Sequence, residues 1–332
     1  MKYLFRLDAS NLVLSYKELD ALIETYTGKR IDMENCISSF CIIDLDVPIF
    51  YKIISRSGYV KEAGRLIALG DRDNPVQDIF VEQDHLVANR YVLKHVRLSN
   101  MDKSVNLKDR ILRSLSIFFD KESREEIVSY ITNNLVITSF IDYKYRATRH
   151  REREPSRRPF FRSIALPIRL SRALINLARV KEGDTILDPF AGTGSILIES
   201  HYMGLKSIGI ELDWKICHGC ATNLNHYRVP SPLILADSTE ITLSEIDVIA
   251  TDPPYGRAAS THGESSLHIY MRFIGKMAEW LRRGGRAVFM SPTYINKDIE
   301  EALCRYGLIL VDKIYMYVHG GLTRTIYVVE KP

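Results

Sequence analysis

The stretch TILDPFAGTGSILIES, residues 185–200, decides the fold of the second half of this chain. Its apolar start, TILD, is typical of a buried strand, and SILIES begins a helix. The turn between them contains Gly192 and Gly194, where a ligand can approach the backbone because no Cβ intervenes. A strand, a glycine-rich turn and a helix in this order predict a ligand site at the carboxyl end of a strand in an open parallel sheet.

Asp188, the last residue of TILD, indicates the kind of ligand. A dinucleotide site would have a third glycine and a Walker phosphate loop would have a lysine, and this turn has neither. A carboxylate at this point repels phosphate and attracts a cation, so the turn suits a ligand with an amino group, such as S-adenosylmethionine. The two glycines alone are equally compatible with a plain strand-to-helix turn.

Four more strands are expected after the turn, and acids end two of them. The apolar segments KSIGIE (206–211), PLILA (232–236), IDVIAT (246–251) and RAVFM (286–290) alternate with helical segments, which indicates a parallel sheet covered on both faces. Two further long β-rich segments at the end of the chain predict an antiparallel pair that closes the sheet edge.

The two acids, Glu211 and Asp237, extend the predicted cofactor site. Glu211 can accept both ribose hydroxyls, and Asp237 can accept from an adenine amino group. Either acid alone could be a solvated turn or a helix cap, but acids at three consecutive strand ends favour a cofactor site. We expect the cofactor to contact Asp188, Phe190, Ala191, Gly192, Thr193, Gly194, Glu211, Leu212, Asp237, Ser238 and Asp252.

The stretch TDPPYG (251–256) follows the fourth strand and predicts a second chemical site. Pro253 and Pro254 fix two φ angles and remove two N–H donors, so the loop is stiff and rich in acceptors. Asp252 adds a carboxylate, which together with the Pro253 carbonyl can bind an exocyclic amine and direct its lone pair. Tyr255 offers a ring on which a base could stack. We expect Asp252, Pro253, Pro254 and Tyr255 to be the catalytic residues, although a bare Asp-Pro-Pro would more often be a rigid turn.

A change of composition near residue 150 suggests two domains. The chain has 332 residues and a net charge of +4, which is comfortable for two cores. Residues 142–162 contain eight Lys or Arg against three Asp or Glu, with Pro155 and Pro159 discouraging a helix. Before this basic stretch, strand and helix signals mix in an α+β pattern. We expect an N-terminal module over residues 1–145, a linker over 146–165 and an α/β domain over 166–332.

The two motifs together carry a family resemblance. DPFAGTG (188–194) followed by DPPYG (252–256) resembles the enzymes that methylate exocyclic amines of bases or glutamine amides. RRPFFRSIALPIRLSRALINLA (157–178) resembles the segment before the cofactor strand in THUMP-containing guanine-N2 RNA methyltransferases. HGGLTRTIYVV (319–329) resembles the tail of the archaeal enzymes that modify guanine 10 of tRNA.

The resemblance implies a fold and an activity. The fold is a Rossmann-like, seven-stranded class I methyltransferase domain preceded by an α+β ferredoxin-like/THUMP module. The activity is S-adenosylmethionine-dependent methylation of the guanosine N2 amine in tRNA, at G10, giving m2G and then m2,2G. Three alternatives stay open: another tRNA position such as 6, a ribosomal RNA site, or a DNA amino methyltransferase.

The implied RNA substrate gives the basic stretch a function. We expect the phosphate backbone to contact the arginines of the linker, although most charge clusters are solvated surface. These residues are Arg146, Arg149, Arg151, Arg153, Arg157 and Arg158.

The remaining features exclude other classes of protein. Five cysteines, odd in number, predict no disulfide framework, and Cys217-x-x-Cys220 lies within one predicted helix without the further pair that structural zinc requires. No apolar stretch approaches the length of a membrane span. We therefore expect a cytoplasmic enzyme that binds tRNA, has no metal, and needs no obligate protein partner.

Overall fold

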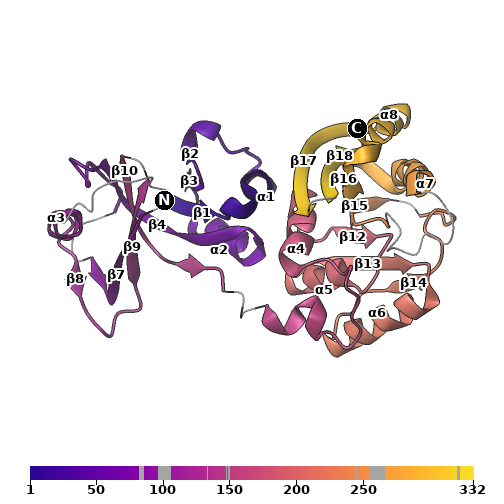
Figure 1. The fold of residues 1–332 in the computed structure, drawn as a ribbon, viewed down its shortest axis with the longest axis horizontal. Helices are drawn as coiled ribbons and strands as arrows, with labels where there is room; N and C mark the ends of the chain where they lie inside the picture. Colours follow the sequence, from indigo (N-terminus) through magenta and orange to yellow (C-terminus); the bar gives the residue numbers. More distant parts are fainter. Residues whose placement is uncertain are drawn as a thin grey trace. The chain divides into compact units, whose positions relative to one another are not determined.

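The computed structural model divides the chain into two compact units (Figure 1). Unit 1 comprises Met1–Ala9, Ile31–Ile54 and Val60–Tyr145, and unit 2 comprises Ser10–Arg30, Ser55–Tyr59 and Arg146–Pro332. The structure describes residues 1–81, 86–95, 106–132, 134–146, 148, 150–243, 245–254, 266–319 and 322–332.

Unit 2 is built on a seven-stranded sheet in its described residues, with the order β14-β13-β12-β15-β16-β18-β17. The neighbours from β14 to β16 are parallel, and β18 is antiparallel to both β16 and β17. The predicted strands and the antiparallel closing pair are confirmed. The strands are β12 (Thr185–Asp188), β13 (Lys206–Glu211), β14 (Leu233–Leu235), β15 (Ile246–Thr251), β16 (Leu281–Pro292), β17 (Ile309–His319) and β18 (Leu322–Glu330).

Helices cover both faces of this sheet, as the apolar strands require. One face is covered by α1, α4, α5 and α6, and the other by α7 and α8. Because β12 lies between β13 and β15, the connections on its two sides leave in opposite directions, and a crevice is expected at the carboxyl ends of β12 and β15. The helices are α1 (Leu12–Thr27), α4 (Ile168–Leu177), α5 (Ser195–Tyr202), α6 (Trp214–His226), α7 (Ser266–Trp280) and α8 (Asn296–Arg305).

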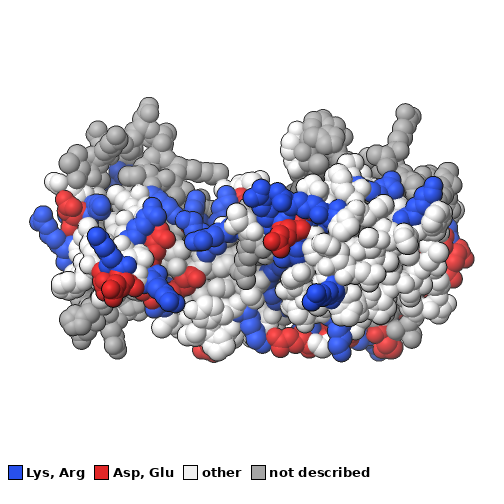
Figure 2. All heavy atoms as spheres, turned by 90° about the horizontal axis from the view of Figure 1, so that it is seen from below, with Lys and Arg blue, Asp and Glu red and all other residues white. Residues whose placement is uncertain are grey.

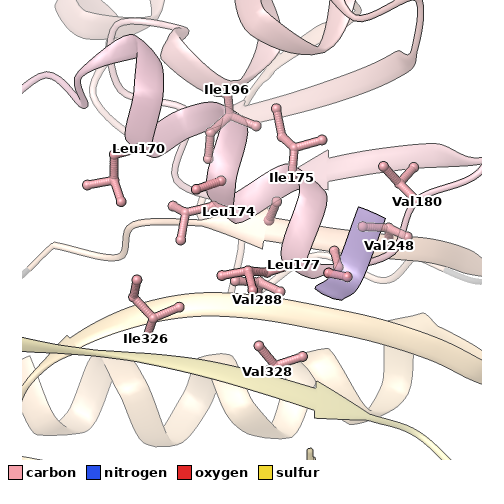
Figure 3. Close-up of a cluster of buried hydrophobic side chains, with 14 of the residues drawn as sticks. Leu170, Leu174, Ile175, Leu177, Val180, Ile196, Val248, Val288, Ile326 and Val328 are labelled. Carbon is pink, nitrogen blue, oxygen red and sulfur yellow. The ribbon is translucent and has the colours of Figure 1, made fainter. Parts of the chain in front are cut away.

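Helix α4 forms the centre of one core. Its apolar face is buried and packs against β15, β16 and β18, as the side chains in Figure 3 show. Leu174 and Leu177 are fully buried, and removing such a side chain from water stabilises a fold by about 1.5–3 kcal/mol.

Helix α1 belongs to unit 2, although the sequence assigns it to the N-terminal module. It starts at Asn11, whose side chain accepts a hydrogen bond from Leu14 N, and ends at Gly28 in the left-handed conformation, φ 72°. Leu14 and Ala21 are part of the core around α4. An N-terminal deletion through α1 would therefore open the core of unit 2.

A buried carboxylate fixes α1 in this position. Both oxygens of Glu18 accept hydrogen bonds, from Ser57 Oγ, Gly58 N and Tyr59 N in the loop 57–59 and from Asn176 Nδ2 in α4, all at 2.8–2.9 Å. Burial raises the pKa of Glu18. The four donors compensate for its removal from water, and they join three separate segments of the chain.

Unit 1 is an α+β unit, in agreement with the pattern of its sequence. Its described strands follow the order β2-β3-β1-β4-β10-β9-β7, with β5 and β11 also paired to β4, and β6 pairs with β8. The strands are β1 (Lys2–Leu7), β2 (Cys36–Ile37), β3 (Phe40–Asp44), β4 (Val60–Asp71), β5 (Asp78–Ile79), β6 (Val87–Ala88), β7 (Arg90–His95), β8 (Phe118–Phe119), β9 (Glu126–Thr132), β10 (Leu135–Phe140) and β11 (Tyr143–Lys144), with helices α2 (Val47–Arg56) and α3 (Leu107–Ser114).

One prediction about the cysteines is wrong. Cys36 and Cys41 form a disulfide. They are directly paired residues of β2 and β3, and this cross-strand register brings their side chains together. A count of cysteines gives no information on strand register.

Candidate active site

Asp188 lies where the sequence places it, at the carboxyl end of β12, and is buried. Its Oδ1 accepts hydrogen bonds from Thr251 Oγ1 at 2.7 Å and from Phe190 N at 3.2 Å. The pKa of Asp188 is raised to about 7, mainly by burial and in smaller part by the neighbouring carboxylates of Glu211 and Asp252. The structure therefore brings three of the predicted acids together, and their combined negative charge favours a cation.

The glycine turn lies beside these acids. Gly192 and Gly194 have φ angles of 53° and 84°, which glycine adopts readily. A Cβ on Gly192 would meet nothing nearer than Phe190 O at 3.9 Å, so open space lies in front of this backbone. A Cβ on Gly194 would approach Cys220 Sγ to 2.9 Å, so this glycine is needed for packing against α6. The two glycines thus differ, since Gly192 faces open space and Gly194 packs against α6.

Glu211 closes the turn from β13. Its Oε2 accepts from Gly192 N at 2.9 Å and its Oε1 from Asp213 N at 3.0 Å. Burial raises the pKa of Glu211. Leu212 N also donates to this carboxylate, so three backbone donors hold Glu211 beside the turn.

The other predicted cofactor residues fall into two groups. Ala191, Thr193 and Ser238 are buried, whereas Leu212 is exposed, and Phe190 packs edge-on against Phe273 at 5.3 Å between ring centres. Asp237 follows β14, and its Oδ1 already accepts from the backbone and hydroxyl of Thr239. Its Oδ2 lies 3.5 Å from Arg272 Nη2. Both oxygens of Asp237 therefore have protein partners, which leaves less acceptor capacity for the predicted contact with adenine.

Asp252 and Pro253 begin the loop after β15. Asp252 Oδ1 is buried and has no hydrogen-bond partner among the described residues, while Oδ2 lies 3.3 Å from Arg324 Nη1. Burial raises the pKa of Asp252 to about 6, and Arg324 opposes that rise. A buried acceptor without a donor is costly in an isolated protein, and a bound amine would supply the missing N–H. Pro254 is half-buried, and Tyr255 lies outside the described residues.

Two functional candidates were not predicted from the sequence, Arg324 and Tyr270. Arg324 comes from β18, where it is paired across the strands with Pro292. The Tyr270 hydroxyl, on α7, donates to Met290 O at 2.8 Å and lies 3.4 Å from Pro253 O. Because a tyrosine hydroxyl has one proton, the shorter bond takes it, and the Pro253 carbonyl keeps its acceptor capacity. The only sequence signal for the Arg324–Asp252 contact was the tail motif that contains Arg324. The two residues are 72 positions apart, so the sequence did not indicate that they meet.

The predicted RNA-binding arginines divide by burial. Arg153 and Arg158 are buried, which corrects the expectation that they contact RNA. Arg153 forms an ion pair with the buried Glu199 at 2.9 Å, and Arg158 donates to Ser195 Oγ at 2.6 Å and so supports the glycine turn. The remaining described members, Arg146, Arg151 and Arg157, are exposed, and Arg149 lies outside the described residues.

Basic side chains are not confined to the linker. Figure 2 shows one face of the chain, on which Lys and Arg gather in patches with Asp and Glu between them. In the described residues, no group of three or more His, Cys, Asp or Glu is placed to hold a metal ion. None of the described helices has the length and apolar character of a membrane span.

The strand order, the glycine turn and the acids at the strand ends define a class I methyltransferase fold. The family comparison agrees, because the RMKL-like methyltransferase domain matches residues 155–326, slightly more than half of the chain. The chain belongs to this family. A second family description, DNA methylase, matches residues 57–222, a range that ends before Asp252.

Curated relatives and a solved structure extend the comparison. A tRNA (guanine(10)-N2)-dimethyltransferase of Methanothermobacter thermautotrophicus is 39% identical over 53% of this chain and 52% of its own length. The protein of the same name from Methanocaldococcus jannaschii is 28% identical over 96% of both chains. The crystal structure of TrmN from Thermus thermophilus covers both chains fully with a TM-score of 0.55 at 17% identity, which supports the fold.

Proposed function

We propose that this protein methylates the exocyclic N2 amine of guanosine in tRNA with S-adenosylmethionine, at G10, giving m2G and then m2,2G. The observation that carries the proposal is the buried Asp252 Oδ1 without a partner in the described residues, next to the Pro253 carbonyl and the acidic turn of β12. The names of the relatives support tRNA and position 10. Position 6 of tRNA, a ribosomal RNA site and a DNA amine are the alternatives.

The residues of the turn fit S-adenosylmethionine. Open space lies in front of Gly192, and the nearby Asp188 carboxylate has no cationic partner in the described chain. Asp188, beside the glycine turn, would hold the amino group of the cofactor, and Glu211 would hold its ribose hydroxyls. When bound, the cofactor supplies an electrophilic methyl group.

The chain's own residues act on the amine. The guanine N2 lone pair is delocalised into the ring, which makes the amine a poor nucleophile. Hydrogen bonds from its two N–H groups to Asp252 Oδ1 and Pro253 O would favour tetrahedral geometry at nitrogen and free the lone pair. Asp252, ionised above its pKa of about 6, can then accept the proton that nitrogen loses. Most of the acceleration comes from positioning and electrostatics.

The N-terminal half is proposed to be the RNA-binding part. A ferredoxin-like/THUMP module over residues 1–145 would hold the tRNA, and the exposed linker residues Arg146, Arg151 and Arg157 would contact its backbone. G10 lies in helical tRNA, so the base must be flipped out at a cost of a few kcal/mol. A cytoplasmic enzyme with no obligate protein partner is consistent with such a substrate.

The activity is tested with unmodified tRNA and isotopically labelled S-adenosylmethionine. Mass spectrometry of nuclease fragments identifies the modified nucleoside and its position. We expect m2G and m2,2G at position 10 and no product with a tRNA that has adenosine there. Labelling at another guanosine would favour the alternatives, and labelling of DNA alone would overturn the proposal.

The proposed RNA-binding part is best tested by point substitutions, because truncation would disturb the fold of unit 2. Deleting residues 1–145 would remove α1 and Glu18 from unit 2, and loss of activity would then report unfolding. Replacing Arg146, Arg151 and Arg157 with glutamate leaves the buried arginines in place. We expect at least 10-fold weaker tRNA binding with unchanged cofactor affinity, and equal tRNA binding would contradict the proposed linker contacts.

A further inference from the structure

Two strongly exposed tyrosines in unit 2 are not explained by the core. Tyr294 and Tyr317 are 69% and 72% exposed, more than most large side chains in the described residues. Scattered exposed apolar residues need no explanation, but these two lie at the edge of the sheet where the carboxyl ends of the parallel strands meet. Their place beside the Asp252 loop makes them candidates for substrate contact.

Tyr294 follows β16 directly. It lies in the 3₁₀ turn Thr293–Ile295, one residue beyond Thr293 and two beyond Pro292, the strand residue paired with Arg324. Arg324 contacts Asp252. Tyr294 is also near enough to raise the pKa of Tyr270, whose hydroxyl lies 3.4 Å from Pro253 O. Tyr294 is therefore at the rim of the amine pocket.

Tyr317 lies on the neighbouring edge strand β17, opposite Thr323, the residue before Arg324. Lys313 on the same strand forms an ion pair with Glu300 of α8, at 2.5 Å. Because strand side chains alternate, Tyr317 lies on the α8 face with Lys313. The start of α8 is held to β18, since Asn296 Oδ1 accepts from Thr325 Oγ1 at 2.9 Å.

These contacts put both tyrosines on one face of the sheet. Tyr294 precedes Asn296 by two residues, and Tyr317 is opposite Thr323, two residues before Thr325. Neighbouring strands are about 4.8 Å apart, so the backbones of β16 and β17, which are separated by β18, lie roughly 10 Å from each other.

We propose that Tyr294 and Tyr317 form a stacking surface for unpaired nucleobases of the RNA strand that enters the Asp252 pocket. Tyr294, at the rim, takes the target base or its immediate neighbour, and Tyr317 takes the next nucleotide. Aromatic rings bind bases of any sequence through their faces, so two exposed rings beside the Asp252 loop suit an unpaired RNA strand. The inference rests on the proposed function, because it presupposes an RNA substrate.

The surface has one competing occupant, a second copy of this chain. β17 is the last strand of the sheet order in the described residues, and an edge strand with exposed aromatic side chains can pair with another copy. RNA is favoured because Tyr294 is not on the edge strand but at the pocket rim, where dimer pairing along β17 would not use it.

The experiment compares tyrosine variants in the full-length protein. Tyr294→Ala, Tyr317→Ala and the double variant are assayed for tRNA kcat/KM, for S-adenosylhomocysteine binding by calorimetry and for mass by light scattering. Tyr294→Phe and Tyr317→Phe keep a stacking ring. Tyr306→Ala, at the other end of α8 and 47% exposed, is the matched control.

The outcomes separate the possibilities. We expect kcat/KM to fall about 10-fold for Tyr294→Ala and about 3-fold for Tyr317→Ala, with wild-type ligand binding and near-wild-type phenylalanine variants. Alanine variants that match Tyr306→Ala would overturn the proposal, as would phenylalanine variants as weak as alanine. A change of molecular mass in Tyr317→Ala would assign the surface to self-association. An inactive wild-type protein would instead count against the proposed function.

Discussion

Asp188 and Asp252 lie at the ends of neighbouring strands, β12 and β15, but different groups hold their carboxylates. Asp188 is buried, whereas Asp252 is partly buried. Asp188 accepts from two neutral donors, Thr251 and Phe190, and its nearest charges are the negative ones of Glu211 and Asp252. Asp252 contacts the cation Arg324 through one oxygen and leaves the other without a partner in the described chain.

The difference indicates what each carboxylate requires. Asp188 is in a negative surrounding and is stabilised by a ligand that is positive. Asp252 already has a positive neighbour and is stabilised by a neutral N–H donor, because its free oxygen lacks a hydrogen bond and not a charge. One fold thus offers adjacent sites for a cationic methyl donor and a neutral amine.

The largest expected effect is that of Asp252→Ala. Removing the acceptor should lower single-turnover methylation about 10³-fold, since one positioned hydrogen-bond partner in an active site contributes about 10²–10³ and the proton acceptor is lost as well. Asp252→Asn keeps an acceptor oxygen, so its single-turnover rate should lie between those of the wild type and Asp252→Ala. Affinity for S-adenosylmethionine should fall far less than the methylation rate, because Asp188 and Glu211 are proposed to hold the amino group and the ribose. If Asp252→Ala keeps a tenth of the wild-type rate, the amine pocket is assigned to the wrong residues.

Asp188→Asn tests the other carboxylate. The amide keeps the acceptor for Thr251 but loses the charge, so cofactor dissociation constants should rise about 10–100-fold. Calorimetric titration with S-adenosylhomocysteine measures this directly. Asp237→Asn is the matched control, and we expect it to lose only about threefold because Thr239 and Arg272 already engage that acid. Equal losses of cofactor affinity in Asp188→Asn and Asp237→Asn would show that Asp188 is not the acid that binds the cation.

The sequence predicted the position of Asp188 and its neighbours better than it predicted the contacts of Asp252. Asp188, Gly192 and Glu211 come from contiguous strand-turn segments, and parallel strands bring their carboxyl ends to one edge by necessity. Strand bounds such as Thr185–Asp188 follow from short apolar runs for the same reason.

Features that depend on distant contacts could not be predicted. Arg324 reaches Asp252 from 72 residues away, through an antiparallel return of the last strand. Arg153 looks like its exposed neighbours in sequence, and only its packing against Glu199 shows that it is internal. The same holds for α1, whose amphipathic pattern gives no indication of the sheet on which it packs.

Acid stability of the ligand-free protein provides a third test of the comparison. The pKa of Asp188 is raised above its unfolded value near 3.8, so its contribution to stability is present at low pH and is lost as pH rises toward about 7. Between pH 5.5 and 7 this loss is about 2 kcal/mol, or about 4–8 °C in Tm. Asp188→Asn should abolish that part of the decline in scanning calorimetry. A variant whose Tm declines as steeply as the wild type would show that Asp188 is ionised throughout this range.

The smallest expected effect is that of Arg324→Gln, and it reports on how Asp252 is kept ionised. Arg324 lowers the pKa of Asp252 against the effect of burial, so its loss should move the acidic limb of the kcat/KM profile to higher pH. We expect about a fivefold loss at pH 6.5 and less than twofold at pH 8.5, where Asp252 is ionised in both proteins. Arg324→Lys should restore the wild-type limb in part, because charge and not bidentate geometry is needed at a single contact of 3.3 Å. A loss of equal size at both pH values would mean that Arg324 only supports the loop, and the contrast between the two aspartates would then rest on the free oxygen of Asp252 alone.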